Sequence, residues 1–216
     1  YMRWIAAVLD SHIQTHLNPD KLRITHLGGG ACSLARYCAD VYPNSRNTVV
    51  ELDAKLAEYV RDWFDIPKSP RVKIRVGDAG TVTRSFAPAS RDVVIRDVFA
   101  VDKTPAELTS VDFARTVDHS LAPGGLYILN CGDGPSLDGA RAEVAALFEV
   151  FEQVCLVADA AMLKGRRRGN IIIAASHSPL PAAGSAEAAA ISRTLMGGGV
   201  PAQYRDSTQA RQFARL

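Results

Sequence analysis

The sequence lacks long apolar runs, paired cysteine motifs and a large excess of either charge. No apolar stretch in the 216 residues approaches the roughly 20 residues that a membrane-spanning helix needs. The most apolar run, Ile171–Ala175, has the length of a buried strand. The formal net charge is only +2, which gives no strong attraction to polyanions. We therefore expect neither a membrane nor a nucleic acid as a partner.

The cysteines also lack the spacing of a metal site. The chain has four of them, namely Cys32, Cys38, Cys131 and Cys155. They form no C-x-x-C pair and have no histidine at metal-ligand spacing, so we expect free thiols and no bound metal. Free thiols and the absence of a basic-then-apolar leader favour a cytoplasmic location. Because the chain begins at Tyr1 rather than Met, we expect it to be part of a longer protein.

What the sequence does contain is the composition of a soluble globular domain, with 47% hydrophobic and 22% charged residues. Short β-branched runs alternate with helical segments. The expected strands are Leu22–Leu27, Thr48–Leu52, Val72–Val76, Asp92–Arg96 and Gly125–Asn130. The expected helices are Tyr1–His16, Leu34–Val41, Ala54–Phe64, Ala106–Leu121 and Leu137–Phe148. This alternation predicts an α/β fold, a Rossmann-like three-layer sandwich with a mostly parallel sheet between two layers of helices.

The end of the pattern differs from the rest. The apolar runs Val150–Ala158 and Asn170–Ser176 are joined by a link that is too short for the usual crossover helix. We therefore predict a seven-stranded sheet that closes with an antiparallel hairpin at one edge. This ending resembles the fold of S-adenosylmethionine-dependent transferases. We expect residues 1–178 to form this domain and residues 179–216 to form a helical or irregular extension of it.

Three features stand where a nucleoside ligand would need them. Gly28, Gly29 and Gly30 follow the first strand directly, and glycines there allow a sharp turn and a close approach by a ligand. Glu51 ends the second strand, at the spacing of an acid that binds ribose hydroxyls. Asp78 and Ala79 follow the third strand, where a carboxylate can accept from an adenine amine. All three features project from the carboxyl edge of one parallel sheet, where open α/β sheets bind ligands.

Each feature also has a purely structural interpretation. The glycines can form a plain strand-to-helix turn, and Glu51 can be a solvated carboxylate at a strand end. Asp78 can cap a helix, and Asp53 is best explained as the N-cap of the helix that begins at Ala54. For Asp97, which follows the fourth strand, the structural alternative is a carboxylate that fixes a loop.

Four successive segments resemble the spermidine synthase family, in order and in spacing. They are Ile24–Gly30, Val49–Asp53, Val76–Ala79 and Asp92–Asp97. Tyr1–Ile5 and Pro105–Glu107 are similar to the family segments on either side, so that the resemblance covers roughly Tyr1 to Ser176. It implies Glu51 on the ribose, Asp78 with Ala79 at the adenine, and the three glycines around the methionine-derived tail.

The same resemblance implies a reaction. It suggests aminopropyl transfer from decarboxylated S-adenosylmethionine to a small amine such as putrescine, with Asp97 as general base and Tyr1 positioning the amine. The co-substrate is then decarboxylated S-adenosylmethionine or S-adenosylmethionine itself, with no prosthetic group, and we also expect a homodimer. The alternatives are a small-molecule methyltransferase that uses S-adenosylmethionine and a non-catalytic nucleoside-binding relative.

Several positions depart from the family pattern. Ala31 stands where the family has an aspartate that holds the donor's ammonium, and the run Val98–Asp102 is one residue longer than usual before Pro105. The Tyr-Pro pair between the last two strands is replaced by Asp159–Met162. These departures put the amine preference in doubt. The basic run Lys164–Arg168 in the same link is either a solvated turn or a contact for an anionic substrate or RNA.

Overall fold

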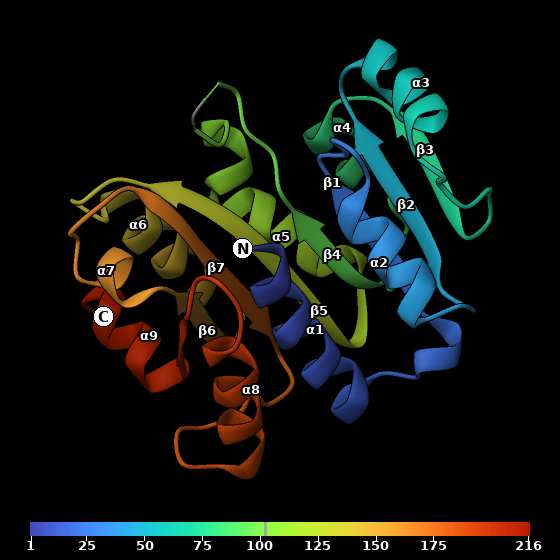
Figure 1. Ribbon diagram of the computed structural model, residues 1–216. Coiled ribbons are helices and arrows are strands. Elements are labelled where there is room, and N and C mark those ends of the chain that lie inside the picture. Colours follow the sequence, from blue (N-terminus) through green and yellow to red (C-terminus); the bar gives the residue numbers. More distant parts are fainter. Residues whose placement is uncertain (102) are drawn as a thin grey trace.

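One sheet organises the computed structural model, which describes residues 1–101 and 103–216 (Figure 1). Within these residues eight strands follow the order β3-β2-β1-β4-β5-β7-β6-β8. They are β1 (Arg23–Leu27), β2 (Arg46–Glu51), β3 (Val72–Val76), β4 (Arg91–Arg96), β5 (Leu121–Asp133), β6 (Gln153–Ala158), β7 (Gly169–Ser176) and β8 (Gln203–Arg205). The first five strands pair in parallel, whereas β7 runs antiparallel to both β5 and β6.

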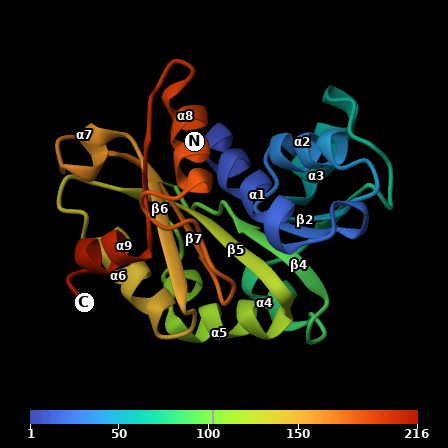
Figure 2. The same cartoon turned by 90° about the horizontal axis from the view of Figure 1, so that it is seen from below.

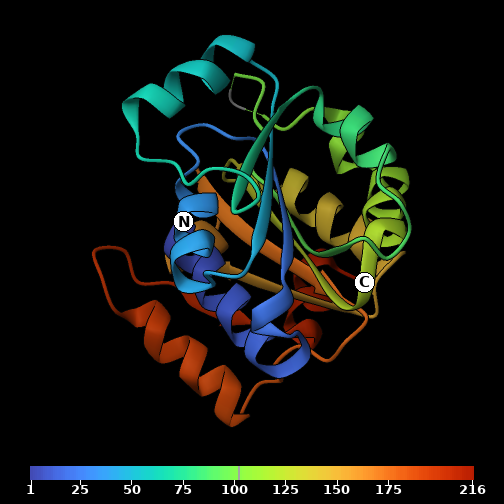
Figure 3. The ribbon, with the colours of Figure 1, turned by 90° about the vertical axis from the view of Figure 1, so that its right-hand side faces the viewer.

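Helices cover both faces of this sheet, as Figures 2 and 3 show. One face carries α1 (Met2–His16), α2 (Ser33–Val41), α3 (Ala54–Trp63) and α8 (Ala186–Met196). The other carries α4 (Ala79–Arg84), α5 (Val111–Ser120), α6 (Asp138–Phe148) and α9 (Ser207–Ala214). Side chains alternate between the faces along each strand. In β4, for example, Val93 and Ile95 pack with α1, whereas Val94 packs with α5. The predicted three-layer α/β sandwich is confirmed.

The closing hairpin is also confirmed, with two additions that the sequence did not predict. The link between β6 and β7 contains a single helical turn, α7 (Ala160–Leu163), which is too short to act as a crossover helix and make β7 parallel to β6. The short strand β8 pairs with β6, so the hairpin is one strand removed from the edge and the sheet has one strand more than predicted. Among the described residues, no helix combines the length and apolarity needed to cross a membrane.

The predicted helix Ala106–Leu121 is wrong in detail. It consists of a 3-10 turn, Ala106–Thr109, followed by α5. The two are separate because Ser110 adopts an extended backbone conformation, and its hydroxyl accepts from the N–H of Phe113 as the N-cap of α5. The predicted strand Val150–Ala158 begins only at Gln153, because Val150 still belongs to the turn that ends α6.

Candidate active site

The glycine loop is fixed by the strand beside it. Gly28 has φ +89°, a conformation that favours glycine, and its N–H donates to the Val50 carbonyl oxygen at 2.9 Å. A Cβ atom at Gly28 would overlap the carbonyl oxygen of Asp97. The chain can therefore turn here only because no side chain is present. The same close approach places the end of β4 directly against the loop.

Glu51, at the end of β2, binds the glycine loop through its carboxylate. Its Oε2 accepts from the N–H groups of Gly29 and Gly30 at 3.0 and 3.1 Å. Its Oε1 accepts from the N–H of Asp53 at 2.9 Å. A carboxylate has about four lone-pair positions, so one position on Oε1 stays open for a further donor. Asp53 caps α3 by accepting from Lys55 and Leu56, as its position in the sequence predicted.

A first cavity of about 360 Å³ opens beside this loop, and we call it the nucleoside-side cavity. It brings together the six residues predicted to bind the cofactor, namely Gly28, Gly29, Gly30, Glu51, Asp78 and Ala79. Asp78 is the N-cap of α4, and its Oδ1 accepts from the N–H of Thr81 at 2.7 Å. This hydrogen bond lowers the pKa of Asp78, so the carboxylate is charged at neutral pH.

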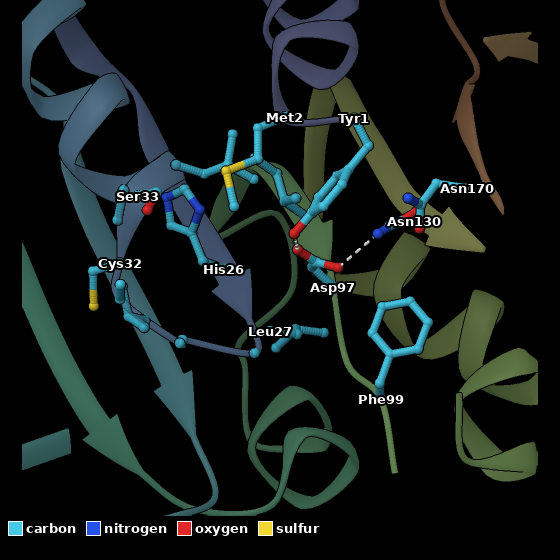
Figure 4. A pocket seen from close by; sticks show the side chains of 18 residues that line it. Tyr1, Met2, His26, Leu27, Cys32, Ser33, Asp97, Phe99, Asn130 and Asn170 are labelled. Atoms are coloured by element: carbon cyan, nitrogen blue, oxygen red, sulfur yellow. Dashed lines mark hydrogen bonds between the residues drawn. The ribbon is translucent and has the colours of Figure 1, made fainter. Parts of the chain in front are cut away.

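A second cavity, of about 450 Å³, lies on the other side of the loop; we call it the acceptor-side cavity (Figure 4). It is lined by His26 of β1, Asn130 of β5 and Asn170 of β7, by Tyr1 directly before α1, and by Asp97 directly after β4. The two cavities share five residues: Gly28, Gly29, Gly30, Asp97 and Phe99. Asp97 therefore stands where the two cavities meet.

Two side chains hold the Asp97 carboxylate, one on each oxygen. The hydroxyl of Tyr1 donates to Oδ2 at 2.7 Å, and Asn130 Nδ2 donates to Oδ1 at 2.9 Å. Burial, together with the hydrogen bond to Asp97, raises the pKa of the Tyr1 phenol, so the hydroxyl stays protonated and acts as a donor. Each carboxylate oxygen keeps room for another donor. The structure thus brings the two predicted catalytic residues together.

Asn130 was missed as a site residue in the sequence. It is 1% exposed, and its Oδ1 is a buried atom without a hydrogen-bond partner among the described residues. A signal was present nonetheless, because Asn130 is the polar residue that ends the apolar run Leu126–Leu129 of a buried strand. A buried amide needs a hydrogen-bond partner. Because open α/β sheets bind ligands at the carboxyl edge, that partner is expected to be a residue of the binding site.

Arg96, immediately before Asp97, was also missed. Its side chain is fully buried and donates from Nη2 to Oε2 of Glu143 at 2.6 Å and from Nη1 to the Leu108 carbonyl oxygen at 2.5 Å. A buried guanidinium needs such partners. The pair joins the end of β4 to α6 and thereby fixes the backbone from which Asp97 projects.

The positions that depart from the family pattern lie in different parts of the structure. Ala31 and Phe99 line it, whereas Asp102 lies outside the described residues. Asp159 caps α7 and pairs with Arg167 at 2.7 Å, so part of the basic run has a structural role. Lys164, in the same run, is exposed.

The comparison with solved structures identifies a close relative. A crystal structure described as that of a probable spermidine synthase from Corynebacterium glutamicum matches with a TM-score of 0.97 and 60% sequence identity. The match covers 99% of this chain and 77% of the other. The chain belongs to the spermidine synthase family. Within that family it is a divergent member, because spermidine synthase from Thermotoga maritima is only 17% identical to it. That match covers 81% of this chain and 60% of the other, with a TM-score of 0.62.

Other matches show the fold. Human methyltransferase-like protein 13, solved in complex with SAH, is 24% identical and covers 91% of this chain and 90% of its own, with a TM-score of 0.66. Among curated proteins, a mouse eEF1A lysine and N-terminal methyltransferase is 34% identical over 80 residues, which is 36% of this chain but only 11% of that protein's length. No protein-family model matches the chain. Family and fold together identify this spermidine synthase relative as a transferase of the S-adenosylmethionine-dependent kind.

Proposed function

We propose that the chain transfers an aminopropyl group from decarboxylated S-adenosylmethionine to a small amine, with Asp97 as general base. The observation that carries this proposal is the cluster of Tyr1, Asp97 and Asn130 at the junction of the two cavities. A donor that enters from the nucleoside side and an amine that enters from the acceptor side meet at this carboxylate. Putrescine, which family membership suggests, is the first amine to assay.

The nucleoside-side cavity supports the donor half of the proposal. There the open position on Glu51 Oε1 is available to a ribose hydroxyl, and Asp78 is available to the adenine amine. Two solved relatives carry related ligands: methyltransferase-like protein 13 holds SAH, and a spermidine synthase holds the transition-state analogue AdoDATO. The glycine loop, which both cavities share, would then lie along the methionine-derived tail.

The chemistry requires little more than a base and good positioning. The amine nitrogen forms a bond to the propyl carbon next to the sulfonium, and the carbon–sulfur bond breaks with its electron pair moving to sulfur. Methylthioadenosine leaves as a neutral thioether, so no acid is needed. The attacking nitrogen must give up a proton, which the Asp97 carboxylate accepts. Tyr1 and Asn130 hold that carboxylate in place throughout.

One observation favours a second candidate, methyl transfer from S-adenosylmethionine itself. Among the described residues that line the acceptor-side cavity, Asp97 is the single acid. The tail of S-adenosylmethionine carries its own carboxylate beside its ammonium and so needs fewer acids from the protein. Calorimetric binding of S-adenosylmethionine, its decarboxylated form and methylthioadenosine to one sample distinguishes the two donors.

Replacement of Asp97 tests the proposed base. Asp97→Asn keeps the shape of the side chain but cannot accept the proton, so turnover should fall about 10²–10⁴-fold, the usual contribution of general-base catalysis. Methylthioadenosine affinity should stay nearly constant. Asp112→Asn, which removes a carboxylate that is 91% exposed on α5, serves as the control. The assay follows methylthioadenosine release from the decarboxylated donor; equal turnover in Asp97→Asn and the wild type would rule out this base.

A further inference from the structure

Two buried acceptor atoms at the acceptor-side cavity have no hydrogen-bond partner in the described part of the chain. They are Nδ1 of His26 and Oδ1 of Asn130, and both side chains line the cavity. His26 is 4% exposed and Asn130 is 1% exposed. A buried polar atom without a partner is costly, so each of these atoms points to a donor that a ligand brings.

The hydrogen bonds of Asn47 decide which nitrogen of His26 can accept. Asn47 Nδ2 donates to the Arg71 carbonyl oxygen at 3.0 Å and to Ser45 Oγ at 2.9 Å. A carbonyl oxygen only accepts, so the amide of Asn47 must turn its Oδ1 towards His26. His26 Nε2 lies 3.0 Å from that oxygen and therefore carries the proton. In the neutral ring Nδ1 is then the acceptor.

Burial keeps this ring neutral. It lowers the pKa of His26 to about 4, and the hydrogen bond to Asn47 offsets only part of this effect. At neutral pH Nδ1 can therefore accept a hydrogen bond but cannot donate one.

Neighbouring strands bring His26 to the sheet face where Asp97 and Asn130 lie. His26 of β1 pairs with Ile95 of β4, and Ile95 pairs with Ile128 of β5. Side chains two residues apart on a strand share a face, so Asn130 projects on the same side as Ile128. Asp97 follows Ile95 by two residues, directly after β4. Figure 4 shows His26, Asp97 and Asn130 around one cavity.

These three side chains form a set of acceptors that suits an ammonium. Asp97 supplies a negative charge, whereas His26 and Asn130 supply neutral lone pairs. A primary ammonium carries one positive charge and three N–H donors, so it can use several of these acceptors at once. A hydroxyl group has a single donor and can use only one of them.

We propose that His26 is a binding residue for the primary ammonium of a substrate, which donates to its Nδ1. The inference rests on the proposed function for the identity of that substrate. The ammonium has two possible sources, namely the aminopropyl tail of the donor and the far amino group of a diamine acceptor.

Nitrogen NMR of the protein with isotope-labelled histidine tests the inference and separates the two sources. When Nδ1 accepts from an ammonium, its resonance should move upfield, towards that of a protonated ring nitrogen, while Nε2 stays in place. Methylthioadenosine has no ammonium and gives the baseline. A shift with decarboxylated S-adenosylmethionine identifies the donor's tail, and a shift with methylthioadenosine plus putrescine identifies the acceptor. No shift with either probe at saturation would overturn the inference.

His12 is the internal control in the same spectra. Its Nδ1 is also buried without a partner among the residues described, and its Nε2 lies 2.8 Å from the Gly124 carbonyl oxygen. It lines a separate cavity, so its resonances should not respond to either probe. Equal shifts at His12 and His26 would contradict a specific contact.

Substitution gives a second readout, with His26→Leu as the test and His12→Leu as the matched control. The Kd of the probe that moves the resonance should rise about tenfold or more in His26→Leu, the effect of one lost hydrogen bond to a charged group. It should stay that of the wild type in His12→Leu, and methylthioadenosine affinity should change in neither. An equal loss of methylthioadenosine affinity in His26→Leu would contradict the assignment. If His26→Leu does not fold, the spectra of the wild type decide.

Turnover separates this inference from the proposed function. If the His26 resonance moves but no amine releases methylthioadenosine, the proposed transfer fails and the ammonium contact stands. If methylthioadenosine is released and the resonance does not move, the contact fails and the proposed transfer stands.

Discussion

Replacing Glu51 with glutamine keeps the shape of the side chain but exchanges one acceptor oxygen for an NH₂ donor. In the structure the two carboxylate oxygens accept from three backbone N–H groups, those of Gly29, Gly30 and Asp53. Whichever way the amide of glutamine turns, at least one of these N–H groups faces another donor. The variant should therefore lose about 1.5–3 kcal/mol of folding stability, the contribution of a hydrogen bond to a charged group.

Nucleoside binding should weaken by a separate amount. If a ribose hydroxyl donates to the open position on Glu51 Oε1, its loss costs about 1–3 kcal/mol, or roughly 5- to 150-fold in Kd for methylthioadenosine. Glu51→Ala should weaken binding by a similar amount, but it also releases the glycine loop from all three of its hydrogen bonds. Glutamine is therefore the sharper test. The assay is calorimetric titration with methylthioadenosine, accompanied by a thermal melt of each variant.

Asp53→Asn is the matched control, because it also removes a carboxylate from the nucleoside-side cavity. Asparagine caps a helix as well as aspartate does, so α3 should keep its cap and the stability should change little. Methylthioadenosine affinity should remain that of the wild type. An unchanged Kd in a folded Glu51→Gln variant would refute the ribose assignment. An equal loss in both variants would show that the cavity responds to total charge and not to Glu51.

Two further predictions concern stability. Gly28→Ala should lower the free energy of unfolding by about 2 kcal/mol or more, since φ is +89° and the new Cβ would meet the Asp97 carbonyl oxygen. Gly30→Ala is the control, because Gly30 has φ +48° and open space around it. In the same urea titration it should lower the free energy of unfolding by less. Burial lowers the pKa of His26 to about 4 in the folded chain. Between this pH and the unfolded pKa of about 6.5, the unfolded chain binds a proton at His26 and the folded chain does not. Stability should therefore fall as the pH drops from 6.5 towards 4, and His26→Gln should flatten that slope; a slope unchanged by the substitution would contradict the assignment.

The parts of the fold that the sequence predicted are those with local signals. Each of these signals is contained in a few consecutive residues: the glycine triplet, the acids at strand ends and the β-branched runs. Parallel strands then bring their carboxyl ends together. For that reason the sequence alone assigns Glu51, Asp78 and the glycine loop to one site, and the three do line one cavity. Asp53 as a helix cap followed from its position alone.

The parts that were missed depend on partners far away in the chain. Arg96 stands at the end of a strand with no local sign of its role, and its partner Glu143 lies 47 residues further on. Tyr1 and Asp97 are 96 residues apart, and in the sequence only the family resemblance connects them. The strand β8 has three residues and forms because β6 offers it a free edge, which no local pattern reveals.

The distribution of acids along the sheet edge separates the two halves of the site. Glu51, Asp53 and Asp78 line the nucleoside-side cavity, where carboxylates can accept from the hydroxyl and amine groups of a neutral nucleoside. On the acceptor side the proposed base, Asp97, is also the one acid among the described lining residues. We therefore expect the nucleoside-side cavity to bind a nucleoside whichever of the two proposed reactions the chain catalyses. It follows that nucleoside binding alone cannot identify the reaction, and that the donor which the protein consumes in the presence of an amine can.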